Sequence, residues 1–511
     1  MKWILEMSSV RVSHPMPKDL FTAAQVRQLD ALAIQSMAAE NGYELMQRAG
    51  RSAFRALVRR WPEAARLTLF CGGGNNGGDG YVVAELARRH NLQVEVFALS
   101  DPEKLRGEAA QAFASCCAAG VDVAIWSPDC LISGDVIVDA MLGTGLSGAV
   151  REDYAAAINA INTAGRPVIA LDIPSGLCAD SGMPLGPTVN AAMTVTFIGM
   201  KRGLVTGEAP DYTGELVFDE LEVPADIYSK LPTACRRSDF SQAVGLAPIR
   251  KPSSHKGMFG RVLVVGGDTG FGGAAIMAAE AAYRAGCGLV SCATRAAHVG
   301  AGLARVPEVM FREINSRGEL LAMLDAAEVI ALGPGLGKEP WGQMCLQTCL
   351  DADKPMVVDA DALNMIAARK LQLNPRSLMT PHPGEAARLL ECSVADVMQD
   401  RFAAARDLAE SYNCHVLLKG VGTLLAAPDQ EELVVVQAGN PGMACGGMGD
   451  VLTGLAAGLL AQGMAPLAAA ELAAAWHGAA ADSATESVAQ ASLMAGDLLK
   501  QLGAVMREAR V

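Results

Sequence analysis

A glycine-rich segment of the N-terminal half, CGGGNNGGDG at residues 71–80, lies between a β-rich run and a helical run. Glycine permits close approach of the backbone to a ligand, and a helix N-terminus offers free N–H groups with partial positive charge. Together these features suit a phosphate group. The segment differs from the usual dinucleotide fingerprint, so a tight connecting turn is the alternative. Its Asn-Asn pair and its Asp favour a ligand, because a plain turn needs only one or two such residues.

Further oxygen groups follow other β-rich runs in this half. Asp139 precedes GTGLSG, and Asp172 and Ser175 belong to the segment DIPSG. Asn76, Asp139 and Ser175 could coordinate a hard cation through oxygen, and this composition suits an alkali or alkaline-earth ion rather than zinc. Taken singly, an acidic residue here is more often a helix cap or a loop brace, and Ser175 a turn hydroxyl. The combination of strand-end segments is what favours a site.

The C-terminal half contains a second glycine-rich segment, GNPGMACGGMGD at residues 439–450. Its loop can present successive amide groups to a phosphoryl group, and Asp450 is placed to accept a proton from a substrate hydroxyl. The alternative role for Asp450 is that of a helix N-cap. The pattern GxxxxGK[ST] does not occur, so this is not a P-loop enzyme.

Two more residues of this half could contact a ligand. His382 stands between two prolines in TPHPGE, where it could instead brace a turn. Lys419 begins KGVGT, whose glycines favour a phosphate or nucleotide contact, although a solvated lysine at a strand end is the alternative.

Repeated βα units must position these residues. In the first half, strands are expected at 66–71, 94–99, 135–141, 167–171 and 192–198, with helices such as 81–89 and 154–164 between them. In the second half, strands are expected at 261–265, 329–332, 356–358, 416–418 and 433–436. Alternating strands and helices predict an α/β fold with mostly parallel sheets, whose ligands bind at the carboxyl ends of the strands.

The pattern lapses over 224–252, which contains four prolines, the last of them Pro252, among scattered charges. We therefore expect an N-terminal domain over 1–236, with a short extension at 1–19, a linker over 237–250 and a C-terminal domain over 251–511.

Composition restricts the function further. The 511 residues are 51% hydrophobic and 19% charged, which is typical of a globular chain, and the formal net charge of -13 argues against a nucleic-acid surface. The 13 cysteines include no CxxC pair, so we expect reduced thiols in a cytoplasmic protein. The uncharged stretch 451–470 contains internal glycines and Pro466, so two buried helices explain it better than a membrane span.

The segments NNGGDG, DAMLGTGLSG and LDIPSG in combination resemble the NAD(P)H-hydrate epimerase family over about residues 20–235. The resemblance implies a Rossmann-like three-layer domain, a potassium ion at Asn76, Asp139 and Ser175, and Asp172 as a reacting group. It also implies that the hydrated cofactor lies against Asp172 and two segments: Asn75, Asn76, Gly77, Gly78 and Asp79, and Gly143, Thr144, Gly145, Leu146, Ser147, Gly148 and Ala149.

The segment GGMGD resembles the GxGD motif of the ribokinase-like superfamily, which transfers phosphoryl groups to hydroxyls. With GGDTGFGGA, ALGPGLG, VVDADALN, TPHPGE and LLKGVGT, it resembles the NAD(P)H-hydrate dehydratase family from about residue 250 onward. By this resemblance the adenine nucleotide binds Lys419, Gly420, Val421, Gly422, Thr423 and Gly449, and the hydrated cofactor faces Ala274, Gly337, His382 and Asp450.

The two resemblances imply one chain that repairs hydrated NADH and NADPH. One domain would interconvert the R and S hydrates, and the other would dehydrate the S form with ADP and Mg²⁺, releasing AMP and phosphate. The residues do not decide between ADP and ATP. Neither nucleic acid nor membrane is an expected partner; a homo-oligomer is expected, although buried helices explain the Ala-rich apolar segments equally well.

Two alternatives remain at this point. A small-molecule kinase of the ribokinase-like group would leave a stable phosphorylated product, and TPHPGE argues against it. The N-terminal half could also be only a binding or scaffold module, against which the intact set of Asn76, Asp139, Asp172 and Ser175 argues.

Overall fold

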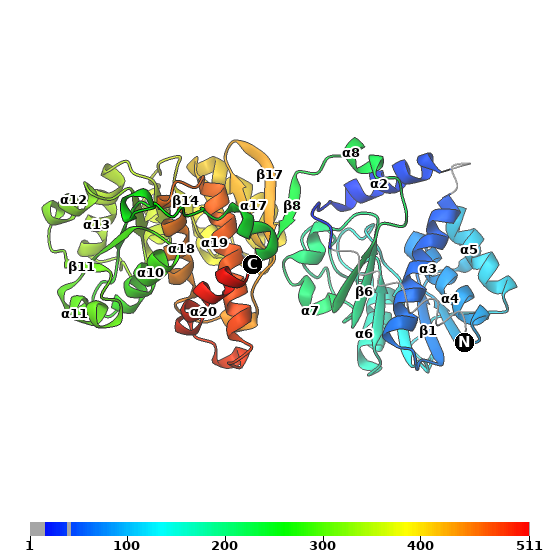
Figure 1. The fold of residues 1–511 in the computed structure, drawn as a ribbon. Coiled ribbons are helices and arrows are strands. Elements are labelled where there is room, and N and C mark those ends of the chain that lie inside the picture. The colour runs from blue at the N-terminus through cyan, green and yellow to red at the C-terminus, as the bar shows by residue number, and fades with distance from the viewer. Residues whose placement is uncertain (1–15, 38–41, 510–511) are drawn as a thin grey trace. The chain divides into compact units, whose positions relative to one another are not determined.

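The computed structural model describes residues 16–37 and 42–509, and the chain divides after Cys235 into an N-terminal and a C-terminal unit (Figure 1). Most of the expected extension, residues 1–15, lies outside the described residues. The expected linker over 237–250 contains regular structure, because strand β8 (Cys235–Ser238) pairs with the edge of the C-terminal sheet. Its Ser238 carbonyl accepts a hydrogen bond from the Gln437 amide at 2.9 Å. The start of this segment is therefore folded into the C-terminal unit.

The N-terminal unit is built on a seven-stranded sheet with the order β3-β2-β1-β4-β5-β6-β7, in which every pair is parallel. Its strands are β1 (Arg66–Cys71), β2 (Gln93–Ala98), β3 (Val123–Ile125), β4 (Val136–Ala140), β5 (Val168–Leu171), β6 (Met193–Phe197) and β7 (Glu215–Asp219). Its helices are α2 (Ala23–Ser36), α3 (Gly42–Arg60), α4 (Asn75–Arg89), α5 (Gly107–Ala118), α6 (Glu152–Thr163), α7 (Ala209–Thr213) and α8 (Asp226–Lys230), with short 3₁₀ turns at Pro102–Lys104 and Arg202–Val205.

Side chains on the two faces of this sheet enter two separate cores. Leu67 and Leu69 of β1 join the core formed with α3, α4 and α5, whereas Phe70 joins the core formed with Ile158 of α6. Strands buried on both faces become nearly continuous apolar runs, which explains why the sequence showed them clearly. The order of strands reverses between β1 and β4, and parallel sheets bind ligands at such a point.

The C-terminal unit has a ten-stranded sheet with the order β11-β10-β9-β12-β13-β14-β15-β16-β17-β8. The pairs from β11 to β15 are parallel, and β16 pairs antiparallel with both β15 and β17. Its remaining strands are β9 (Arg261–Val265), β10 (Leu289–Thr294), β11 (Met310–Glu313), β12 (Val329–Leu332), β13 (Met356–Val358), β14 (Leu378–Met379), β15 (His415–Leu418), β16 (Thr423–Ala427) and β17 (Gln430–Val436).

Helices cover this sheet and connect its strands. They are α9 (Phe240–Ala243), α10 (Gly272–Arg284), α11 (Ala296–Arg305), α12 (Arg317–Leu324), α13 (Pro340–Asp351), α14 (Ala360–Arg369), α15 (Pro383–Leu389), α16 (Val394–Gln399), α17 (Arg401–Tyr412), α18 (Met448–Ala461), α19 (Pro466–Ala484) and α20 (Ala495–Glu508). Short 3₁₀ turns lie at Val244–Leu246, Lys256–Met258, Pro441–Met443 and Gln490–Ser492. The α/β class expected for both halves is thus observed.

The uncharged stretch 451–470 forms parts of two buried helices, as expected, with the break between Ala461 of α18 and Pro466 of α19. Helix α18 packs closely on α10, where a methyl group at Gly454 would overlap the Ala278 carbonyl oxygen. Among the described residues, no helix is long and apolar enough to cross a membrane. The cysteines are all free, and most of them are buried, with Cys117, Cys392 and Cys445 exposed.

Candidate active sites

A cavity of about 800 Å³ opens at the carboxyl ends of β1 and β4 in the N-terminal unit. Helix α4 begins there at Asn75, so the segment NNGGDG forms the first turns of the helix rather than a loop. The sequence placed this helix start too late because glycine is rare in helices. Here the glycines serve close packing: a side chain at Gly77 would overlap the Gly72 carbonyl, and one at Gly78 would contact Met46.

The N-terminus of α4 presents unsatisfied backbone donors to the cavity. Gly74 is its N-cap and provides no side-chain cap, and Gly73, Gly74 and Asn75 all line the cavity. Free N–H groups at the positive end of a helix dipole bind anions. The dinucleotide expected from the sequence carries a pyrophosphate, and this end of the cavity suits such an anionic group.

Beneath the cavity, three oxygen-bearing residues form one buried group. The Asp139 carboxylate accepts hydrogen bonds from the Ser175 amide at 2.8 Å and from the Ser175 hydroxyl at 2.6 Å. The amide nitrogen of Asn76 donates to the Leu142 carbonyl at 3.2 Å, and its buried Oδ1 atom has no hydrogen-bond partner among the residues that the structure describes. Burial raises the pKa of Asp139 to about 6, although its bonds from Ser175 and Met141 oppose the rise. An orphan amide oxygen beside a buried carboxylate fits a bound cation.

Asp172 follows β5 and is held by Lys201, which is fully buried. The ammonium group of Lys201 donates to Asp172 Oδ1, to the Thr196 hydroxyl at 2.9 Å and to the Phe197 carbonyl at 3.1 Å. All three donors of the lysine are therefore used, and they fix one oxygen of Asp172. The backbone of Asp172 has φ of 64°, a conformation rare for residues other than glycine and frequent at functional sites.

Two more carboxyl groups, Asp30 of α2 and Asp79 of α4, line the cavity with Asp172. Burial raises the pKa of Asp30 to about 6, with Lys201 opposing the rise and Asp172 adding to it. Burial also raises the pKa of Asp79 well above its ordinary value, and the charges of Asp172 and Asp30 add to the rise. One buried lysine thus faces three carboxyl groups, and the raised pKa values of Asp30 and Asp79 mean that these two bind protons more readily than free carboxylates do.

The structure brings most of the predicted N-terminal residues to this cavity. Those lining it are Asn75, Asn76, Asp79, Gly143, Thr144, Gly145, Leu146, Ser147, Ala149 and Asp172. Gly77 and Gly78 are buried in α4, and Gly148 is exposed outside the lining. Sequence reasoning missed Lys201 and Asp30. The segment GMKRG at the end of β6 offered a signal for Lys201, a charge next to an apolar run, whereas Asp30 offered none.

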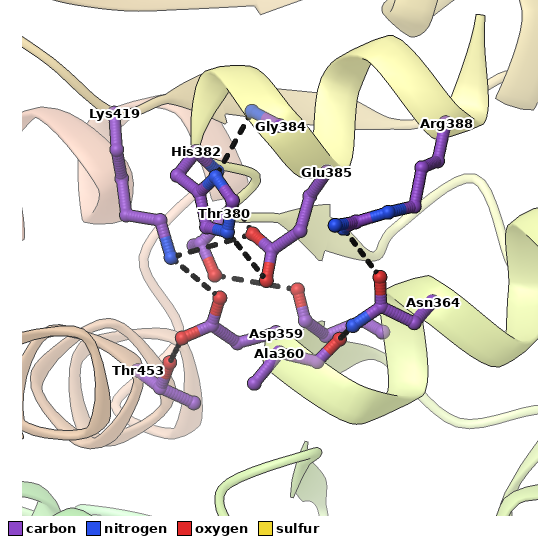
Figure 2. A network of polar contacts seen from close by, with 11 residues as sticks. Asp359, Ala360, Asn364, Thr380, His382, Gly384, Glu385, Arg388, Lys419 and Thr453 are labelled. Atoms are coloured by element: carbon purple, nitrogen blue, oxygen red, sulfur yellow. Dashed lines mark hydrogen bonds and ion pairs between the residues drawn. The ribbon is translucent and has the colours of Figure 1, made fainter. Parts of the chain in front are cut away.

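In the C-terminal unit, Asp359 at the end of β13 is the centre of a polar network (Figure 2). Its Oδ1 atom pairs with Lys419 Nζ at 2.7 Å, and its Oδ2 atom accepts a hydrogen bond from the Thr453 hydroxyl of α18 at 2.9 Å. Lys419 also lies 3.7 Å from Glu385. Burial lowers the pKa of Lys419, but the charges of Asp359 and Glu385 outweigh it and raise the pKa overall. Lys419 is therefore not a solvated residue at a strand end.

Asp450 is the third residue of α18. The N-cap is Gly447, whose φ of 94° requires glycine, so Asp450 is not the cap that the alternative assumed. Burial raises the pKa of Asp450 to about 7; the Asp359 charge adds to this rise and the Lys419 charge opposes it. A carboxyl group with this pKa can act as a general base at neutral pH.

Residues of α19 form hydrogen bonds to the loop that precedes α18. Asp482 accepts hydrogen bonds from the Gly439 amide at 3.0 Å and from the Asn440 side chain at 2.9 Å. The imidazole of His477 bonds to the Met448 backbone, and burial lowers the pKa of His477 to about 4, so this ring is neutral. The glycine-rich loop and the helix N-terminus are thus fixed before any ligand binds.

His382 is the N-cap of α15, where its Nδ1 atom accepts a hydrogen bond from the Gly384 amide at 3.0 Å. It does brace this turn, yet about half of its side chain is exposed and accessible to a ligand. Burial lowers the pKa of His382, and the charges of Lys419 and Arg388 lower it further. Neutral His382 therefore carries its proton on Nε2, which lies 3.5 Å from Glu385.

The predicted nucleotide segment turns sharply between β15 and β16. Gly420 and Gly422 have positive φ, and Val421 is exposed at its tip. Beneath it the buried guanidinium of Arg401 donates to the Val421 carbonyl at 2.6 Å and to the Lys419 carbonyl at 3.3 Å. Gly449 is close by, since a Cβ atom on it would lie 3.5 Å from Lys419 Nζ. Lys419, the loop and Gly449 thus come together as expected.

The remaining predicted residues, Ala274 and Gly337, lie at the carboxyl ends of β9 and β12. The Gly337 amide donates to Asp361 at 3.0 Å, and a Cβ atom on Gly337 would lie 2.8 Å from Asp268. Sequence reasoning missed Asp359, Glu385 and Asp361 as site residues, although it singled out the segments that contain them. Their role depends on contacts with residues distant in the chain, which no local pattern reports.

Comparison with known proteins gives consistent matches for both units. Residues 42–203 match the family model of the YjeF-related protein N-terminus, and residues 262–503 match that of NAD(P)H-hydrate dehydratase. The chain is 46% identical over 483 residues to the bifunctional NAD(P)H-hydrate repair enzyme Nnr of Coxiella burnetii, covering 94% of this chain and 98% of the relative. It is 43% identical over 465 residues to the enzyme of that name from Escherichia coli, covering 90% and 88%. A ribokinase-like superfamily protein from Enterococcus faecalis superimposes with a TM-score of 0.51 at 27% identity, covering 54% of this chain and 97% of that one.

Proposed function

The chain belongs to the family of bifunctional NAD(P)H-hydrate repair enzymes, and from this premise we propose that Asp172 and Asp450 are the reacting groups of its two sites. Its N-terminal unit is the epimerase and its C-terminal unit, which has a ribokinase-like fold, is the dehydratase. The assignment of individual residues rests on the geometry of the two sites.

In the epimerase site, the hydrated nicotinamide lies against the loop 143–149 and Asp172. Because Lys201 holds Oδ1, the free oxygen for the reaction is Oδ2, which would lie 3.8 Å from a Cβ atom on Gly143. The substrate hydroxyl is bonded to the carbon next to the ring nitrogen. Protonation lets it leave as water with help from the nitrogen lone pair, and water then returns to either face. Asp172 can deliver the proton and take it back from the incoming water.

Potassium is the cation proposed beneath this site. Asn76 Oδ1, the Asp139 carboxylate and the Ser175 hydroxyl would hold it, and the unpartnered Asn76 oxygen is the observation that supports this. When bound, the ion would offset the charge of Asp139 and fix the loop at residues 142–143.

In the dehydratase site, Asp450 removes the proton from the C6 hydroxyl of the S hydrate as that oxygen attacks the terminal phosphoryl group of ADP. The loop amides before Asp450 and the N-terminus of α18 stabilise the charge on the moving phosphoryl group. AMP leaves, the ring nitrogen then expels phosphate, and loss of a proton from C5 restores the dihydronicotinamide. The observation that carries this proposal is the raised pKa of Asp450 at a helix N-terminus, beside Lys419.

Magnesium is proposed to arrive with ADP. Among the described residues there is no group of three His, Cys, Asp or Glu side chains able to hold a metal ion. This agrees with an ion bound mainly by nucleotide phosphates, whose charge it would neutralise. The adenine nucleotide would bind at Lys419–Thr423 and Gly449, and both hydrated NADH and hydrated NADPH are proposed substrates. A homo-oligomer in the cytoplasm remains our expectation.

The test uses a mixture of both hydrate epimers with ADP and magnesium, followed by the absorbance of the dihydronicotinamide. The full-length chain should restore nearly all of the cofactor. Asp172→Asn should restore only the S fraction, and Asp450→Asn almost none. Stoichiometric release of phosphate separates this reaction from that of a small-molecule kinase, which would accumulate a phosphorylated product. No recovery with either ADP or ATP would refute the proposal.

A further inference from the structure

A second pocket, of about 350 Å³, lies among helices α13, α14 and α15 of the C-terminal unit. Three basic side chains line it with two amides and an apolar floor. The lining residues are Lys338, Arg369, Arg388, Gln343, Asn364, Met365 and Ala368. No carboxylate belongs to this lining.

The three basic residues of this pocket differ from most cations of the chain in their pairing. Within the described part of the chain, Lys338, Arg369 and Arg388 form no ion pair with a carboxylate, and the side chain of Arg388 donates only to Asn364 Oδ1, at 2.8 Å. Other basic residues of this unit do form ion pairs: Lys370 pairs with Glu391 at 2.5 Å, and Arg317 pairs with Asp351 at 2.9 Å. In a chain of net charge -13, three unpaired cations around one pocket repel one another. A bound anion would remove that repulsion.

The pocket adjoins residues of the proposed dehydratase site in the sequence and in the polar network. Lys338 directly follows Gly337, and Arg388 lies one turn of α15 beyond Glu385. Figure 2 shows Arg388 and Asn364 on the side of the network that carries Glu385 and Ala360. Asn364 also donates to the Ala360 carbonyl at 3.1 Å, which fixes the amide oxygen that accepts from Arg388. A cofactor held at Gly337 and His382 could therefore extend into the pocket.

We propose that this pocket binds the ribose 2′-phosphate of hydrated NADPH and so distinguishes it from hydrated NADH; the inference rests on the proposed dehydratase function. A phosphate monoester carries nearly two negative charges near neutral pH and several acceptor oxygens. Planar guanidinium groups bind such oxygens in pairs, and lysine adds a point charge. Arginine beside the adenosine ribose is a recurring means of accepting a 2′-phosphate. The adenosine end of the cofactor thus lies toward α13 and α14, away from Asp450.

The experiment compares two substrates in the full-length protein. Dehydration of the S hydrates of NADH and of NADPH is measured at saturating ADP for the wild type, for Arg388→Gln and for the double variant Lys338→Gln/Arg369→Gln. The double variant avoids Arg388, whose charge also acts on His382. Exposed Arg376 of the same unit supplies the control Arg376→Gln. We expect KM for hydrated NADPH to rise about tenfold in each test variant. KM for hydrated NADH and both kcat values should change less than about twofold.

Binding without catalysis gives a second readout. Calorimetric titration with NADP⁺ and NAD⁺ should show a preference for NADP⁺ that both test variants lose and Arg376→Gln keeps. Inorganic phosphate should compete with NADP⁺ in the wild type and in Arg376→Gln, but in neither test variant. Equal loss for both dinucleotides, or no loss for either, would overturn the proposal. Turnover of hydrated NADH by the wild type is measured first, so failure of the underlying dehydratase function shows itself separately.

Discussion

Replacing Asp450 by Asn should have opposite effects on activity and on stability. The pKa of this carboxyl rises from its ordinary value of 3.8 to about 7, chiefly because it is buried and also because Asp359 is near. One pKa unit corresponds to about 1.4 kcal/mol, so keeping Asp450 ionised costs the folded protein at most about 4 kcal/mol relative to the unfolded chain. Asn has the same shape and stays neutral at every pH.

The sign of the stability change depends on pH. Below about pH 4 the carboxyl is protonated in the folded and the unfolded chain, and the cost vanishes. Between about pH 4 and pH 7 only the unfolded chain is fully ionised, and the cost of folding grows with pH. Above pH 7 the folded protein is ionised as well and the cost is complete. Asp450→Asn should therefore be more stable than the wild type at pH 8 and equally stable at pH 4.

Activity should change in the opposite direction. Loss of a general base typically lowers a rate by 10²–10⁴-fold, and we expect kcat/KM for dehydration to fall by about 10³. In the wild type, kcat/KM should rise about tenfold per pH unit below pH 7 and then level off, because the free enzyme must hold Asp450 as a carboxylate. Asp359→Asn removes a charge that raises this pKa, so the rise should move to lower pH.

Thermal unfolding followed by calorimetry measures the stability change. The two units can unfold separately, and the transition that ADP shifts upward identifies the C-terminal unit. Asp407→Asn removes the same charge at an exposed position of α17 and should alter neither transition nor activity. A lower or unchanged transition temperature for Asp450→Asn at pH 8 would refute the claim that ionised Asp450 lowers the stability of the folded protein. Retained dehydration would refute its role as the base.

Three further predictions concern the buried groups. Asn76→Ala should lower epimerase activity and abolish its dependence on potassium, as judged by titration of K⁺ against a Na⁺ background, because it removes the one unpartnered ligand oxygen. Lys201→Met should destabilise the N-terminal unit by about 3 kcal/mol in urea unfolding, since Asp172 loses its charge partner, and should leave dehydration of the S epimer intact. Gly454→Val should lower the stability of the C-terminal unit by about 3 kcal/mol, measured in the same way, because its side chain would overlap the Ala278 carbonyl of α10.

Much of this fold can be predicted from the sequence, because parallel strands buried on both faces form continuous apolar runs. Strands at 261–265, 329–332 and 356–358 have the bounds that the sequence predicts. The start of α4 was harder to place. Glycine usually marks a loop, but in α4 it allows the backbone to approach other backbone closely at Gly77, and Gly454 does the same within α18. Only the packed structure distinguishes these two uses of glycine.

The sequence motifs identify candidate residues for each site, but they do not show which distant residues form ion pairs with them. Lys201 is 29 residues from Asp172, and Lys419 is 60 residues from Asp359. Such pairs form because strand ends meet at one edge of a sheet, and their spacing follows from the lengths of the connecting helices. The periodicity of apolar residues gives no information about this spacing. The electrostatics of both sites therefore required the structure.

Those lysines explain why two carboxyl groups on similar scaffolds can do different work. In the N-terminal site, Lys201 binds Asp172, the proposed reacting group, and fixes one of its oxygens. In the C-terminal site, Lys419 binds Asp359, and Asp450 receives only part of the lysine's field while it faces the charge of Asp359. Epimerisation returns the proton that it uses, so we propose that one carboxyl group held in a fixed position suffices for it. Phosphoryl transfer needs a base that takes up a proton at neutral pH, and such a base must not be the lysine's direct partner. We infer that the placement of one ammonium group suits each aspartate to its proposed task.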